Sequence, residues 1–92
     1  MTLLEAIGSF KSLDQESTIY AVKPWTPSSE VVLELEPEEG ELPPGTIPAG
    51  FDYFLEVFIV EEFLDGWASN WPSEPSLYEK CERLIQYAIY DA

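Results

Sequence analysis

The chain of 92 residues contains no histidine, a single cysteine and only four basic residues. Without histidine, the usual proton donor and acceptor near neutral pH is missing, and no histidine-based catalytic triad or metal site can form. A single cysteine excludes an internal disulfide, so the fold must be stabilised by its hydrophobic core. This cysteine usage favours a reducing compartment, and we expect the protein in the cytoplasm.

Basic residues are absent from residues 24–79, whereas thirteen of the eighteen acids lie there and the net charge is −14. Binding a phosphate backbone requires Lys and Arg to displace counterions, which excludes direct binding to DNA or RNA. A membrane partner is excluded as well. The negative leaflet repels this charge, and the most apolar segment, residues 54–60, is far shorter than the roughly 20 residues of a span. The N-terminus also lacks the basic start and apolar block of a secretory signal.

Hydrophobic residues make up 46% of the chain and aromatic residues 14%. This content is too high for an intrinsically disordered chain, despite the charge. The length is that of one small domain, residues 1–92, which is near the lower limit for burying its own core.

Helical periodicity is present at both ends of the chain. Thr2 with Glu5 matches a capping box, and the apolar spacing that follows predicts a helix over residues 3–11. A second helix is predicted from Val60 to about residue 69. Ser76 with Glu79 repeats the capping box and opens a helix over residues 76–90.

Three segments between these helices predict strands. Residues 18–22 are rich in β-branched and aromatic residues. In residues 30–36, Val31, Leu33 and Leu35 fall on a face expected to be buried, opposite Glu30, Glu34, Glu36 and Val32. Residues 37–50, with four Pro and three Gly, predict a long loop. Residues 51–59 favour a strand, and a longer helix there is the alternative.

The expected order is therefore α-β-β-β-α-α, an α+β fold in which a small, three-stranded, mainly antiparallel sheet has helices packed on one face. Residues 51–59 are apolar on both faces, which is typical of a covered strand. We therefore expect the third strand at the centre of the sheet.

Two residues are candidates for chemistry, Glu56 and Cys81. Glu56 lies within the most apolar segment, but we expect it at a strand edge, facing solvent or hydrogen-bonded. Cys81 lies on the apolar stripe of the last helix and is expected to be a packed core thiol. The acids of residues 34–41 lack the alternation of a calcium loop. We therefore expect no enzyme activity, no metal and no cofactor.

Two features indicate a binding surface. Carboxylates gather along one strand face and the loop that follows, at Glu30, Glu34, Glu36, Glu38, Glu39 and Glu41. Trp25, held between two prolines beside that strand, is of the kind that anchors interfaces, although it can equally pack beneath its own loop. The alternative for the carboxylates is a solvated face that keeps the protein soluble and its edge strand unpaired.

In size and charge the chain resembles bacterial immunity proteins and antitoxins, which are often small, acidic, single-domain inhibitors of basic nucleases. The expected function is thus a non-enzymatic module that docks a basic protein partner. One alternative is an inhibitor that mimics phosphates and targets a DNA-binding protein, since alternate strand residues lie about 6.7 Å apart. Another is an assembly subunit, such as a homodimer, whose acidity serves solubility alone.

The charge distribution predicts how thermal stability depends on salt. Folding concentrates like charges, and salt screens their repulsion, so the melting temperature should rise between low and moderate ionic strength. Circular dichroism melts at increasing NaCl measure this. A flat or falling melting temperature would mean that the acids are already paired or dispersed.

Overall fold

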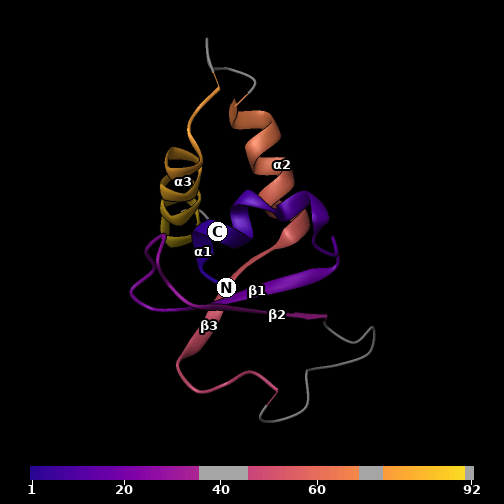
Figure 1. Cartoon of the computed structure of the whole chain (residues 1–92), viewed down its shortest axis with the longest axis vertical. Helices are drawn as coiled ribbons and strands as arrows, with labels where there is room; N and C mark the ends of the chain where they lie inside the picture. The colour runs from indigo at the N-terminus through magenta and orange to yellow at the C-terminus, as the bar shows by residue number, and fades with distance from the viewer. Residues whose placement is uncertain (36–45, 69–73, 91–92) are drawn as a thin grey trace.

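Three strands form one antiparallel sheet, and the helices lie together on one side of it (Figure 1). This computed structural model describes residues 1–35, 46–68 and 74–90. The elements, in chain order, are α1 (Leu3–Gly8), the 3₁₀ helix η1 (Phe10–Ser12), β1 (Ser17–Val22), β2 (Val31–Leu35), β3 (Phe51–Glu56), α2 (Val57–Ala68) and α3 (Leu77–Tyr90). The expected α+β class and the order α-β-β-β-α-α are confirmed.

The strand order is β2-β1-β3, so the expectation of a central third strand is wrong. β1 occupies the middle and pairs with both neighbours, with Ile19 opposite Leu33 on one side and Leu55 on the other. β3 is an edge strand, although its sequence has apolar residues on both faces, as a covered central strand does.

A β-bulge explains this misleading pattern. The register between β1 and β3 shifts between Ile19 and Tyr20, which leaves Phe54 as the extra residue of β3. Phe54 and Leu55 are consecutive, yet both are buried, because the bulge breaks the regular alternation of side chains. The predicted strand over residues 51–59 is correct as far as Glu56. The helix α2 then begins at Val57 without an intervening loop.

β2 forms the other edge of the sheet, and its predicted buried face is only partly correct. Val31 is buried and Leu33 packs against the core, but Leu35 is 53% exposed because it lies at the far end of an edge strand. At the near end, the N-terminal residues run along the outer edge of β2. The N–H of Val31 donates to the carbonyl of Met1 at 2.9 Å, and the N–H of Leu3 donates to the carbonyl of Ser29 at 2.8 Å.

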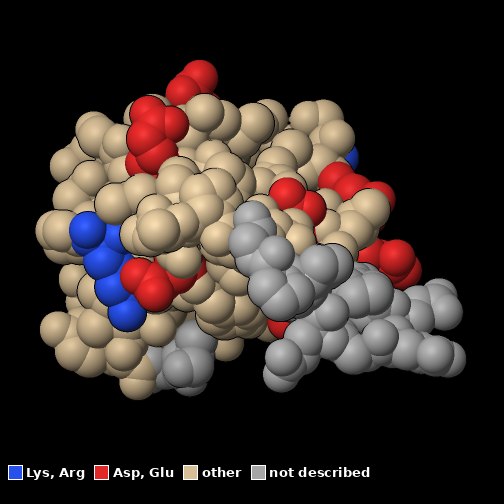
Figure 2. All heavy atoms as spheres, turned by 90° about the horizontal axis from the view of Figure 1, so that it is seen from below, with Lys and Arg blue, Asp and Glu red and all other residues tan. Residues whose placement is uncertain are grey.

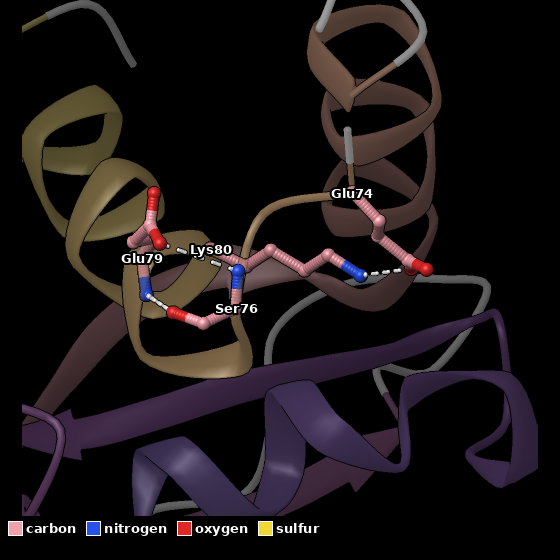
Figure 3. Close-up of polar contacts among 4 residues, drawn as sticks. All are labelled: Glu74, Ser76, Glu79 and Lys80. Carbon is pink, nitrogen blue, oxygen red and sulfur yellow. Dashed lines mark hydrogen bonds and ion pairs between the residues drawn. The ribbon is translucent and has the colours of Figure 1, made fainter. Parts of the chain in front are cut away.

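Both predicted capping boxes are present. Thr2 and Glu5 exchange side-chain and backbone hydrogen bonds of 2.9 and 3.2 Å at the start of α1. The hydrogen bonds that the carboxylate of Glu5 accepts from the backbone N–H and the side chain of Thr2 hold the pKa of Glu5 below its ordinary value. Ser76 and Glu79 form the same pair at the start of α3 (Figure 3). The first helix is shorter than predicted, since α1 ends at Gly8 and the chain continues as η1.

The core lies between the sheet and the helices. Its largest fully buried side chains come from every layer, with Leu3 and Ile7 from α1, Ile19 from β1, Leu55 from β3 and Leu84 from α3. Burial of each such side chain contributes roughly 1.5–3 kcal/mol of hydrophobic free energy. The helix-bearing side of the sheet therefore holds the hydrophobic core that stabilises the fold.

Leu55 and Leu35 lie on edge strands but differ in burial, and they give a matched test of the sheet. Leu55→Ala should lower the free energy of unfolding by about 2–5 kcal/mol, because it leaves a cavity beside Ile19. Leu35→Ala removes the same atoms from an exposed site and should cost no more than about 0.5 kcal/mol. Urea unfolding measures both. Equal losses would contradict the edge position of Leu35.

Candidate functional site

Trp25, one of the predicted binding residues, lies on the helix side of the sheet and is half-buried. Its ring packs edge-on against Phe54, with centroids 5.0 Å apart, and its indole N–H donates to the carbonyl of Ala21 at 3.2 Å. Its other neighbours include Ile89 near the end of α3. The structure therefore places Trp25 mainly as a packing residue, and its role in binding stays a prediction.

Glu30 and Glu34 are the two predicted carboxylates that fall within the described residues. Glu30 precedes β2 and its side chain is 66% exposed, with Oε2 3.7 Å from the N-terminal amino group. Glu34 is half-buried near the other end of β2. The remaining predicted carboxylates, Glu36, Glu38, Glu39 and Glu41, lie outside the described residues.

The pairing register brings a third carboxylate onto the face that carries Glu34. Thr18 of β1 is opposite Glu34 on one side and opposite Glu56 on the other. Directly paired residues of antiparallel strands point to the same side of a sheet. Glu34, Thr18 and Glu56 therefore form a row across the face opposite the helices, with Thr18 buried between the two carboxylates.

Two tyrosines lie beside this row. Tyr20 of β1 is opposite Tyr53 of β3, and their rings meet edge-on with centroids 6.4 Å apart. Tyr53 is 45% exposed, and its hydroxyl donates to Oε1 of Glu56 at 3.4 Å. Glu56 is thus half-buried and hydrogen-bonded, as one of its two expected settings, and it ends the edge strand β3.

We define the sheet-face cluster as Tyr20, Tyr53, Glu34 and Glu56. Viewed from the sheet side, uncharged residues fill most of the surface, acidic groups lie on both sides of them, and basic side chains occupy little of it (Figure 2). Aromatic residues surrounded by polar groups are typical of the centre of a protein interface. The predicted carboxylate patch and this cluster share Glu34.

The four basic side chains are all described, and three of them lie over aromatic rings. Lys11 lies 5.9 Å from the ring centre of Phe10, Lys23 lies 5.0 Å from that of Trp25, and Arg83 lies 5.9 Å from that of Phe63. The fourth, Lys80, pairs with Glu74 at 2.8 Å (Figure 3). This bond lowers the pKa of Glu74.

Within the described residues, therefore, only Glu30 and Glu74 form ion pairs, and thirteen carboxylates share that part of the chain. The remaining residues contain no Lys or Arg that could neutralise them. The charge of the sheet-face cluster is consequently left without a cation from this chain.

Two open hollows lie elsewhere on the surface. One, of about 420 Å³, is lined by Tyr78, Glu82 and Arg83 of α3 together with Trp67. The other, of about 340 Å³, lies between Lys23, Trp25 and Ile89. Each contains a basic side chain, Arg83 or Lys23, whereas no basic side chain of this chain pairs with the carboxylates of the sheet face.

Cys81 is fully buried, as predicted, and its burial raises the pKa of the thiol to about 11. A thiol in this setting is a poor nucleophile and a poor metal ligand. Across residues 1–35, 46–68 and 74–90, no three side chains of the metal-binding types come together. None of the helices in those ranges has the length and apolar character needed to cross a membrane.

Comparison with protein-family models, with curated proteins and with solved structures finds no match for this chain. The candidate site is therefore defined by its own geometry and charge.

The raised pKa of Cys81 predicts a pH dependence of stability. Because the folded state holds the thiol proton more tightly, this contribution is complete below about pH 9 and is lost as pH rises towards about 11. Urea unfolding between pH 8 and 10.5 should show a smaller loss in Cys81→Ala than in the unaltered protein. The variant serves as the control for the lysines and tyrosines that titrate in the same range. Parallel losses would contradict the assignment, as would rapid alkylation of the native protein at pH 8.

Proposed function

We propose that this protein is a non-enzymatic interaction module that docks a basic protein partner through its carboxylate-bearing sheet side. The observation that supports this proposal is the unbalanced charge. Every basic side chain is engaged by an aromatic ring or by Glu74, while the carboxylates of β2 and β3 form no ion pair with a basic side chain of this chain. A cationic surface on a partner would supply the positive charge that these carboxylates lack within the chain.

Electrostatic complementarity of this kind acts mainly on association. An oppositely charged partner is steered towards the surface, which raises the association rate by about ten- to a thousandfold at low salt. A net charge of −14 on 92 residues gives a strong field for its size. Fast capture of a basic target is the property that an inhibitor of the immunity-protein or antitoxin type needs, and a buried, reduced Cys81 suits the cytoplasm where such inhibitors act.

Variants of matched charge test the proposal. Glu30→Gln, Glu34→Gln and Glu36→Gln together remove three charges from the patch, of which Glu36 lies outside the described residues. Glu61→Gln, Glu62→Gln and Asp65→Asn remove three from α2. The tagged protein is first used to capture partners from its host at low and high salt, and each captured protein is identified by mass spectrometry.

Affinity and association rate are then measured with the purified partner. We expect a basic protein whose association slows at least about tenfold with the patch variant and much less with the α2 variant. An unchanged rate with the patch variant would contradict the proposal and favour an assembly subunit whose acidity serves solubility. Release of nucleic acid from a captured DNA-binding protein would favour the phosphate-mimicking alternative.

A further inference from the structure

The sheet-face cluster combines an aromatic surface with carboxylates at a fixed position. The edge-on contact with Tyr20 restrains the ring of Tyr53, whose hydroxyl in turn holds Oε1 of Glu56. Glu56 and Tyr53 belong to the same short edge strand, and Glu34 lies two strands away across Thr18. The groups therefore belong to a rigid sheet and not to a loop.

These two carboxylates are less exposed than most of those on the helices. Glu34 and Glu56 are half-buried, as are Glu61 and Glu82, whereas Glu62 and Asp65 of α2 are exposed. Partial loss of hydration destabilises a carboxylate unless it gains a partner. The described residues provide no cation for Glu34 or Glu56, and the rest of the chain contains no basic residue. A cation from outside would meet this need.

We propose that the sheet-face cluster binds an arginine side chain of the partner, with the guanidinium against Tyr53 and paired to Glu56. This inference rests on the proposed function and specifies the residue type that the site selects. A guanidinium is planar and weakly hydrated, so it can lie on an aromatic ring while it donates two parallel hydrogen bonds to a carboxylate. The ammonium of lysine is compact and strongly hydrated, and it gains less from the ring. Glu34 adds a second negative charge on the same face.

A second tyrosine–carboxylate pair in the molecule provides an internal comparison. Tyr78 of α3 is 57% exposed and donates to Glu82, a bond that raises the pKa of Tyr78. The same hollow is lined by Arg83 and also by Glu79, so a basic side chain of this chain already lies beside the carboxylates there. Tyr78 and Glu82 therefore have the chemistry of the cluster without its charge environment.

Two peptides of equal charge test the inference directly. Acetylated and amidated tetra-arginine and tetra-lysine are titrated into the isotopically labelled full chain at about physiological ionic strength, with binding followed by NMR. We expect tetra-arginine to bind about two- to fivefold more tightly than tetra-lysine. Its largest shifts should fall on the rings of Tyr20 and Tyr53.

Variants localise the preference. Tyr53→Leu should abolish the preference for arginine while leaving the charge-dependent part of binding, and Glu56→Gln should weaken tetra-arginine more than tetra-lysine. Tyr78→Leu and Glu62→Gln are the matched controls and should keep the preference. Melting curves establish that each variant folds, and the comparison of the two peptides on the unaltered protein needs no variant.

The possible outcomes separate this inference from the proposed function. Equal affinity for the two peptides, or shifts centred on Tyr78, would overturn the arginine site while leaving the docking of a basic partner intact. If neither peptide binds, the arginine site is also overturned, whichever partner the capture experiment identifies. Loss of partner capture with a persistent arginine preference at Tyr53 would instead contradict the proposed function alone.

Discussion

The central position of β1 is the constraint on which the rest of the structure depends. Its alternation directs Ile19 and Ala21, both fully buried, towards the helices, and it directs Tyr20 towards the opposite side. Because both neighbouring strands take their register from β1, their side chains follow the same division. A slip of one residue would exchange the two faces and bury the tyrosine in place of the isoleucine. Hydrophobic burial on one side thus fixes which residues are displayed on the other.

Local patterns in the sequence were sufficient for the features that depend on local contacts. The two capping boxes each involve residues three positions apart, and α3 follows from the apolar stripe that contains Cys81 and Leu84. The order of the strands could not be obtained in this way, since it depends on which segments pair. The bulge at Phe54 explains why the third strand was expected at the centre. It allows the consecutive side chains of Phe54 and Leu55 both to be buried, which gives this edge strand the apolar composition of a central one.

In the candidate site, too, local sequence patterns predicted some residues, and others became recognisable only from the pairing of the strands. The carboxylates at Glu30 and Glu34 were visible as a repeated acidic pattern, but the tyrosines acquire meaning only through the pairing of Tyr20 with Tyr53. The alternation of side chains in residues 18–22 was the one sequence pattern that indicated Tyr20, because it places Tyr20 and Ile19 on different faces of the strand. For Trp25 the sequence leaves interface anchor and packing residue equally open, and its contacts in the structure are those of a packing residue. Two prolines restrain its loop, yet its ring rests on Phe54 and its N–H is already hydrogen-bonded.

The position of the carboxylates, more than their number, favours a binding role over solubility alone. A solubilising charge is most effective where water reaches it fully, as at Glu62 and Asp65, whereas Glu34 and Glu56 are half-buried beside an aromatic pair. Self-association through the sheet edges would bring two charges of −14 together, a total of −28, and this repulsion is greatest at low salt. The same field that opposes a second copy attracts a cationic surface. A partner rich in arginine relieves both the repulsion and the incomplete hydration of Glu34 and Glu56, which a second acidic chain cannot do.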